Sequence, residues 1–435
     1  MNDQIATGPQ PAGGSELTVD ESTVTRKQWK WTVLAGMASY LDAGSIVALG
    51  SGLALFQSEL GLSAGAVGAL AAVGPNAIGC AIGALIGGRL GDVLGRKRIY
   101  QWDLLIYAFG ILLIGFSVNA PMLFIGTFIV GVTVGADVPT SLALVGEFSP
   151  AKARGRLLGF SQVAWNSGPV VVLLLALALS STGLIGIRIV FFQLAAVALV
   201  TWFLRRGMSE SLRWKTAREQ VTDRHRLREL FRGANLRGLG WTTGIYLFWN
   251  IAAGTSGIFT PFMVSTLGGG GQAVSVGLQL AGFVIGILAT VFIFMPLFDR
   301  TFRTRKTLWA IGAIMQILGW GVFIVLPFNI PTVIFNAFMA GVGGALAGEA
   351  VYKIFSQELF PTMLRGTAQG LTFGLARLCL GVWSLFVPIL AETSFTVVGG
   401  LLTLFLAISG VIGFFFMPHT VGKSLEEIAA ERGTA

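Results

Sequence analysis

Five charged side chains lie inside long apolar stretches of this 435-residue chain. They are Asp42, Asp137, Glu349, Lys353 and Arg377. A charge at the centre of a membrane-spanning helix costs about 2.5–3.5 kcal/mol even on the permissive insertion scale. Such side chains are therefore expected to face an interior cavity, where they pair with one another, carry protons or contact a substrate. The three acids are candidate proton-coupling residues.

Polar and aromatic side chains in the same apolar stretches form a candidate substrate-binding set. Its members are Gln162, Asn166, Trp249, Asn250, Ser256, Lys353, Arg377 and Trp383. Gln162 and Asn166 are four residues apart and would share a helix face. Paired amides suit hydroxyl-rich ligands because each offers a donor and an acceptor. A single amide more often joins two helices, and a tryptophan at a helix end often anchors at the membrane interface.

The two cations of this set have two interpretations. Glu349 and Lys353 are also four residues apart, so they can form an internal ion pair on one helix face. Alternatively, Lys353 and Arg377 hold a carboxylate or phosphate group of the substrate, which arginine binds with two parallel hydrogen bonds. Both interpretations stay open at the level of the sequence.

The composition identifies the elements that carry these residues. Hydrophobic residues make up 54% of the chain and charged residues 12%, with a mean hydropathy of +0.76, which excludes a soluble protein of this length. Apolar runs of about 20 residues predict membrane-spanning helices. We predict an all-α polytopic membrane protein with twelve such helices. They span 31–56, 67–86, 99–118, 121–146, 157–180, 184–204, 239–265, 273–298, 307–326, 331–355, 366–391 and 396–417.

The basic residues predict the orientation in the membrane. All Lys and Arg except Arg188, Lys353 and Arg377 fall in every second loop or in the terminal segments. The positive-inside rule then places both termini in the cytoplasm of a multi-pass cell (inner) membrane protein. The net charge of +9 forms no single patch, so we expect no nucleic acid as a partner.

The chain also repeats itself. Segment 147–159 matches 358–370, and segment 92–98 matches 299–305. Parallel six-helix repeats, with a binding site between them, are typical of alternating-access transporters. We predict a disordered tail (1–25), a first half (26–206), a linker with short helices (207–236), a second half (237–417) and a C-terminal tail (418–435).

Several loop motifs carry a family resemblance. Segment 87–98, GGRLGDVLGRKR, closely resembles the loop between the second and third helices of the major facilitator superfamily. The pattern Glu-x2-Pro-x3-Arg-Gly, which begins at Glu147 and again at Glu358, resembles that of the sugar porter family. Segments 209–214 and 418–428 are similar to further sugar porter motifs, although 209–214 lacks both of the family's prolines.

The resemblance implies a cytoplasmic gate of ion pairs that closes one end of the transport path. The expected members are Asp92, Arg96, Glu147, Arg154, Glu210, Arg213, Asp299, Arg303, Glu358 and Arg365. Exposed pairs contribute only about 0–1 kcal/mol each, but a network that spans two rigid halves biases an equilibrium between two states. The alternative is that these charges only set the topology.

The resemblance also assigns roles at membrane depth. Asp42 matches the first-helix carboxylate that proton-coupled sugar porters protonate. The family's partner arginine is absent, because Thr127 occupies its position, and Asp137 is a candidate second carrier. Lys353 stands where sugar porters keep the tryptophan that stacks on the sugar ring.

These features predict proton-coupled uptake of a sugar or of a polyol or cyclitol such as inositol. The alternative is a proton symporter of an organic anion held by Lys353 and Arg377; a sensor and a drug exporter are further alternatives. We expect a monomer in the lipid bilayer, whose partners are a small polar solute and a proton. The chain contains no phosphate-binding loop, no nucleophile motif and only two histidines, so we expect no enzyme activity, cofactor or metal.

Overall fold

The computed structural model describes residues 24–207, 210–220, 227–266 and 272–432, and every regular element in these ranges is helical. The predicted tail 1–25 lies, except for its last two residues, outside the described residues. Ten helical runs are long and apolar enough to cross a membrane, and α9 and α15 complete the twelve segments. The fold is therefore all-α, with twelve membrane-spanning segments, as the sequence predicts.

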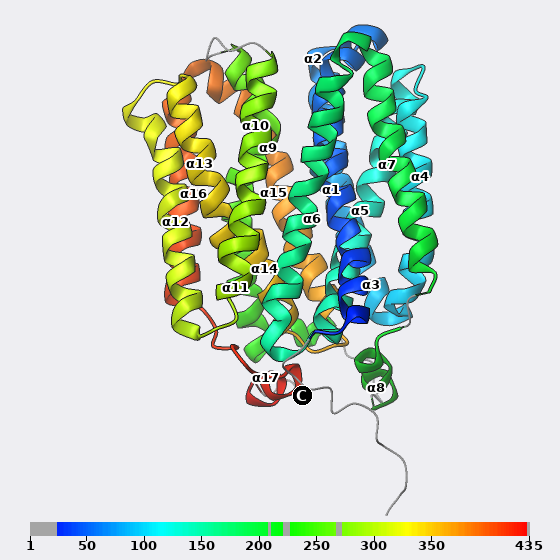
Figure 1. The fold of residues 1–435 in the computed structure, drawn as a ribbon, viewed down its shortest axis with the longest axis vertical. Helices are drawn as coiled ribbons and strands as arrows, with labels where there is room; N and C mark the ends of the chain where they lie inside the picture. Colours follow the sequence, from blue (N-terminus) through cyan, green and yellow to red (C-terminus); the bar gives the residue numbers. More distant parts are fainter. Residues whose placement is uncertain (1–23, 208–209, 221–226, 267–271, 433–435) are drawn as a thin grey trace, which may run out of the picture.

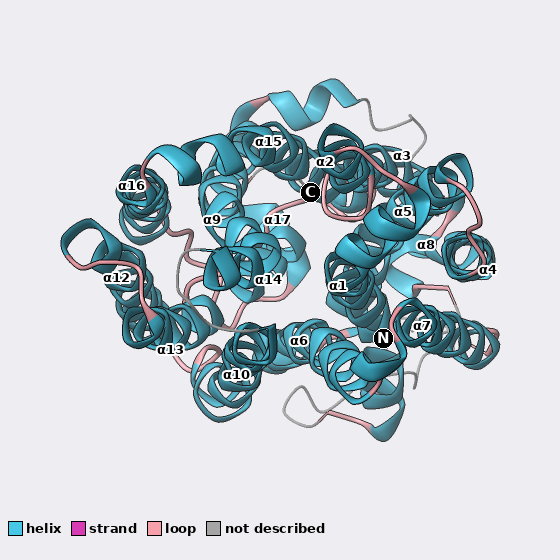
Figure 2. Cartoon of the chain, turned by 90° about the horizontal axis from the view of Figure 1, so that it is seen from above, coloured by secondary structure: helices cyan, strands magenta, loops and turns pink. Residues whose placement is uncertain are grey.

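The helices form two halves. The first half contains α1 (Arg26–Leu60), α2 (Ala64–Val73), α3 (Ile78–Leu94), α4 (Arg96–Gly115), α5 (Ala120–Phe148), α6 (Arg154–Ala178) and α7 (Leu184–Arg205). The second half contains α9 (Gly233–Thr266), α10 (Gln272–Ala289), α11 (Met295–Leu297), α12 (Phe302–Val325), α13 (Ile330–Leu346), α14 (Glu349–Glu358), α15 (Arg365–Thr393) and α16 (Phe395–Phe415). Viewed from above, the two groups lie side by side (Figure 2). They meet where α3 packs on α15 and where α6 packs on α10.

Two segments that the sequence predicts as continuous helices are broken. The second segment bends between α2 and α3, where Pro75 disfavours the helical conformation at Gly74. The tenth segment bends between α13 and α14, where a side chain at Gly348 would meet the Trp249 ring at 2.8 Å. The eighth segment contains a π-helical turn, Thr290–Phe294, between α10 and α11. The first two breaks lie beside the charges discussed below.

The outer surface of the bundle is apolar. Large side chains such as Phe109, Phe203 and Phe292 are more than half exposed, whereas charged residues inside the bundle are almost fully buried. This distribution suits a protein whose surroundings are lipid and whose interior holds the polar groups.

One end of the bundle carries most of the basic loops. The short helices α8 (Leu212–Gln220) and α17 (Leu425–Glu431) lie below the bundle at this end in Figure 1. The loops 95–98, 149–156 and 298–306 also lie here, and we call it the basic end. Both described chain ends, at residues 24 and 432, lie on this side of the molecule.

Candidate functional site

A cavity of about 170 Å³ lies between the halves, lined by α6, α9, α10, α12 and α13. Its polar lining is mostly amide, and its largest rings are tryptophans. These residues are Gln162, Trp165, Asn166, Trp249, Gln279, Gln316, Trp320 and Asn336. No Asp, Glu, Lys or Arg of the described residues lines the cavity. The volume is far above the roughly 10–15 Å³ that one water needs, so a small solute can enter.

The amides differ in how much hydrogen-bonding capacity they keep for a ligand. Gln316 is fully engaged, because its Nε2 donates to three backbone carbonyls and its Oε1 accepts from the Trp249 indole at 2.7 Å. Gln162 Nε2 and Gln279 Oε1 have no protein partner in the described part of the chain. The same holds for both ends of the Asn166 amide. The free groups include donors and acceptors, the combination that a hydroxyl requires.

The structure places half of the predicted substrate-binding set at this cavity. Gln162, Asn166, Trp249 and Ser256 line it. Asn250 and Trp383 do not: the Asn250 amide donates to the Tyr246 hydroxyl at 3.4 Å, and the Trp383 indole donates to Thr255 at 2.9 Å. Asn250 follows Trp249 directly, so it points about 100° away around the helix.

The two predicted cations also lie outside the cavity lining. Lys353 and Arg377 are at most 3% exposed. Lys353 pairs with Glu349 at 3.5 Å, and Arg377 pairs with Asp42 at 3.3 Å. We call these four residues the central charge cluster. Because it holds two acids and two bases, it is neutral as a whole.

The central charge cluster contacts the cavity through two lining residues. Lys353 Nζ donates to Gln162 Oε1 at 3.2 Å, and the Trp165 indole donates to Asp42 Oδ2 at 3.1 Å. Gln162 and Trp165 are on α6 and face both the charges and the cavity. A solute that moves either side chain therefore changes the surroundings of a buried charge.

The pair of Asp42 and Arg377 joins the two halves. Asp42 lies on α1 and Arg377 on α15. Arg377 also donates to Asn76 Oδ1 at 3.0 Å, in the break between α2 and α3. Asp42 therefore has an arginine of the opposite half as its ion-pair partner. Thr127, at the family's arginine position, is buried next to Gly74.

Asp137 lies apart from the cavity. It is inside the first half and pairs with Arg205 of α7 at 2.9 Å. From the sequence, Arg205 is expected in a loop, but its long side chain turns back into the bundle and is 3% exposed. Asp137 therefore does not contact a solute in this cavity.

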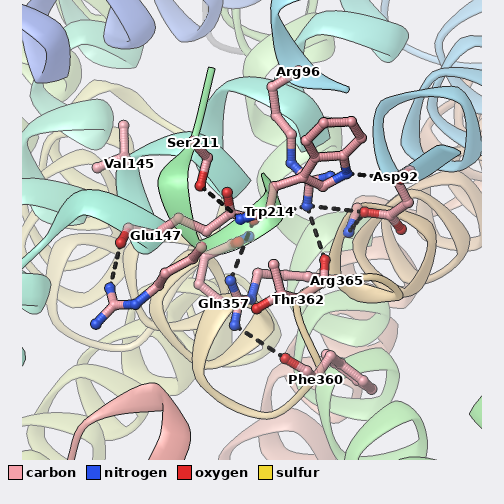
Figure 3. A network of polar contacts seen from close by, with 12 residues as sticks. Asp92, Arg96, Val145, Glu147, Ser211, Trp214, Gln357, Phe360, Thr362 and Arg365 are labelled. Carbon is pink, nitrogen blue, oxygen red and sulfur yellow. Dashed lines mark hydrogen bonds and ion pairs between the residues drawn. The ribbon is translucent and has the colours of Figure 1, made fainter. Parts of the chain in front are cut away.

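A network of buried ion pairs joins the two halves at the basic end. Arg96 contacts Asp92 at 3.1 Å and Glu147 at 2.7 Å, and Glu147 also contacts Arg365 at 3.4 Å (Figure 3). The Asp92 carboxylate accepts hydrogen bonds from the backbone of Gly366 and Thr367, at the start of α15. A carboxylate at a helix N-terminus is stabilised by the helix dipole. These contacts join the first half to the second.

Further predicted gate residues take part at the same end. Arg154 pairs with Glu358 at 3.2 Å across the halves. Glu210 accepts hydrogen bonds from the backbone of residues 96 and 97. Arg213 pairs with Glu426 of α17 at 2.8 Å and donates to the Glu147 carbonyl.

Arg303 is the gate prediction that the structure corrects. Its side chain is exposed. The arginine of this loop that contacts the acids is Arg305, which is 1% exposed and pairs with Asp299 at 3.2 Å and Glu358 at 3.0 Å. The repeat alignment paired Arg303 with Arg96, but the fold of the loop turns the second arginine inward.

Substitution of Arg305 and Arg303 by Gln is expected to have very different effects. Arg305→Gln leaves the buried Glu358 with Arg154 alone and removes the ion-pair partner of the partly buried Asp299. Removing one partner of a buried ion pair typically costs about 3–5 kcal/mol. Arg303→Gln changes an exposed residue, so its effect on stability should stay within about 0.5 kcal/mol. Thermal unfolding in detergent compares the two variants. Equal melting temperatures would contradict this assignment.

Comparisons with known proteins agree with this architecture. A family model described as Major Facilitator Superfamily matches residues 32–376. The minor myo-inositol transporter IolF of Bacillus subtilis (strain 168) is 40% identical over 412 residues, covering 92% of this chain and 93% of that protein. The major myo-inositol transporter IolT of the same organism is 25% identical, and the match covers 80% of this chain and 82% of that protein.

Among solved structures, the proton:xylose symporter XylE bound to 6-bromo-6-deoxy-D-glucose is similar in fold. Its TM-score is 0.81 at 18% identity, with 93% of this chain and 99% of that chain covered.

Proposed function

This chain belongs to the Major Facilitator Superfamily, and from that membership we propose that it carries a small uncharged polyol across the cell membrane together with a proton. The expected solutes are a cyclitol such as inositol, or a sugar. The likeness to the myo-inositol transporter IolF over most of both chains supports a cyclitol. Residues 26–206 and 237–417 move as two bodies about the cavity and expose it to each side in turn.

The observation that carries this proposal is the chemistry of the cavity. Its polar lining consists mainly of amides, several with free donors or acceptors, and the described lining residues include no charged group. Hydroxyl groups match such amides, whereas a carboxylate would remain without a counter-charge. The cations that the anion hypothesis requires are already paired with acids. The geometry therefore favours a neutral solute over an organic anion.

Orientation, setting and coupling complete the proposal. The basic end faces the cytoplasm of a cell inner membrane, in accordance with the positive-inside rule. The protein acts as a monomer. Asp42 carries the proton, because its carboxylate is buried, joins the two halves and touches a residue of the cavity. Protonation of Asp42 would break its ion pair with Arg377 and loosen the contact between the halves.

Counterflow uptake in proteoliposomes tests the substrate class. Labelled myo-inositol outside the vesicles should exchange with unlabelled myo-inositol inside. Unlabelled cyclitols, polyols or sugars should compete, whereas sugar acids and aromatic acids should not. Competition by the acids alone would overturn the proposal in favour of the anion symporter.

Asn166→Ala should weaken solute binding by about 1–2 kcal/mol, roughly five- to thirtyfold in Kd, because a free donor and acceptor are lost from the cavity. Gln193→Ala is the matched control: Gln193 is an amide inside the same half, but it donates to the Tyr40 hydroxyl and does not line the cavity. Binding of labelled myo-inositol to purified protein measures both. An equal loss in the two variants would mean that Asn166 has no direct contact with the solute.

A further inference from the structure

A second group of buried charges lies inside the first half, and its charges do not balance. Asp103 of α4 and Asp137 of α5 both face Arg205 of α7, and we call these three residues the first-half triad. Arg205 Nη1 is 2.9 Å from Asp137 Oδ2 and 3.9 Å from Asp103 Oδ2. All three side chains are at most 3% exposed. Two acids thus share one base, in contrast to the neutral central charge cluster.

Among the residues that the structure describes, no second cation contacts the triad. Arg205 also donates to the Leu34 and Ala35 carbonyls of α1, and its guanidinium lies 4.8 Å from the centre of the Tyr100 ring. The Ser141 hydroxyl of α5 donates to Asp137. The titratable neighbours in the described part of the chain are therefore two tyrosines, Tyr100 and Tyr107, which are neutral at pH 7. Two ionised acids here would leave one buried negative charge uncompensated, which is costly.

A small cavity opens beside the two acids. Its volume is about 10 Å³, and its lining includes Asp103, Asp137, Thr133 and Tyr107. This is about the space of one water molecule, but the surface that faces it is apolar and offers a water no hydrogen-bond partner. Asp103 Oδ2 is buried and has no hydrogen-bond partner in the described part of the chain. A carboxylate oxygen in this position would be unsatisfied, whereas a protonated carboxyl could donate to Asp137.

The cavity also approaches the proposed proton carrier. Leu41, the neighbour of Asp42 in the chain, lines it from α1. The Tyr107 hydroxyl donates to the Leu41 carbonyl at 3.2 Å. Tyr107 therefore connects the wall of this cavity to the backbone next to Asp42. Arg205 is the last residue of α7, so the triad lies near the end of this helix at the basic end.

We propose that the first-half triad is a second proton-binding site, in which Asp103 and Asp137 share one proton and Arg205 balances the remaining charge. During transport the triad releases its shared proton to water at the basic end, while the O–H bond at Asp42 breaks and its proton passes by way of the Tyr107 hydroxyl to the triad. The triad is then neutral again, and Asp42, once more charged, re-forms its ion pair with Arg377. The relay rests on the proposed proton coupling, but proton binding by the triad does not.

Infrared spectroscopy tests the proton directly, in full-length protein carrying Asp42→Asn so that Asp42 makes no contribution. The C=O stretching band of a protonated carboxylic acid is expected near pH 7. Adding Asp103→Asn should remove it, and so should Asp137→Asn, because one remaining acid is then balanced by Arg205. The nearest contact between Asp103 and Arg205 is 3.9 Å long, so Asp103→Asn should disturb the fold less than Asp137→Asn. The Asp103→Asn variant therefore tests the shared proton even if Asp137→Asn does not fold. A band that is absent from the start, or unchanged by Asp103→Asn, overturns the proposal.

Transport assays test the relay. Asp103→Asn in the otherwise native chain should strongly lower proton-driven accumulation of myo-inositol and lower counterflow far less. Unchanged accumulation overturns the relay. If the native protein itself does not accumulate solute under a proton gradient, the proposed coupling fails, and the infrared band still decides whether the triad binds a proton.

Discussion

The Asp42→Asn variant is expected to exchange solute across the membrane but not to accumulate it. Asn keeps the hydrogen bond with the Trp165 indole, but it carries no charge for Arg377 and cannot bind or release a proton. The two halves can then change conformation without a proton bound at position 42. In proteoliposomes with an imposed proton gradient, the final solute concentration inside should be no higher than outside, while counterflow continues.

Glu59→Gln is the matched control for this experiment. Glu59 is on the same helix, α1, but it is exposed near the end opposite the basic end. Its substitution should leave accumulation at the native level. Full accumulation by Asp42→Asn would show that another group carries the proton. Loss of both accumulation and counterflow would show that the Asp42–Arg377 pair is needed for the conformational change itself.

The second large effect is expected from a single methyl group at the basic end. A Cβ at Gly370 of α15 would lie 2.1 Å from the backbone oxygen of Ala84 in α3. Because a backbone atom cannot rotate away, Gly370→Ala must separate the two helices and strain the contacts of Asp92 with α15. Overpacking of this kind costs about 1–3 kcal/mol, which shifts a two-state equilibrium roughly 5- to 150-fold. The variant should favour the state open at the basic end.

Spin labels on the basic end measure this opening. Arg98 and Arg303 are exposed and lie on the first and second half, so labelled cysteines at these positions report the distance between the halves. Cys80→Ala and Cys379→Ala remove the native thiols. Gly370→Ala should lengthen the mean distance, and uptake should slow. Gly400→Ala, where the added methyl meets no atom within 4 Å, should change neither. An unchanged distance in Gly370→Ala would refute the tight helix contact.

Much of this architecture could be predicted from the sequence. Apolar runs gave the twelve segments, because the length of a membrane-spanning helix is set by the bilayer. The loop motifs pointed to contacts between Glu147, Arg96 and Arg365, which the structure contains. Asp42 was marked by the energetic cost of a charge in lipid.

The side-chain partners could not be predicted, because they depend on how the helices rotate and pack against one another. Periodicity places a residue on a helix but does not tell which neighbour that face meets. Asp42 was therefore assigned no partner, although Arg377 lies opposite it. The role of Arg305 depends on a loop conformation, and Arg205 turns inward from a helix end. The amides Gln279, Gln316 and Asn336 stood alone in apolar runs and could have been found by the same cost argument as the charges.

The absence of charge from the described cavity lining has an electrical consequence. A neutral solute experiences no force from the membrane voltage, so in a one-proton cycle the voltage acts through the proton alone. Each 100 mV, negative inside, then contributes about 2.3 kcal/mol to uptake, equivalent to roughly a 50-fold concentration ratio. An energised cell could therefore gather its solute from dilute surroundings even where the outside is no more acidic than the inside.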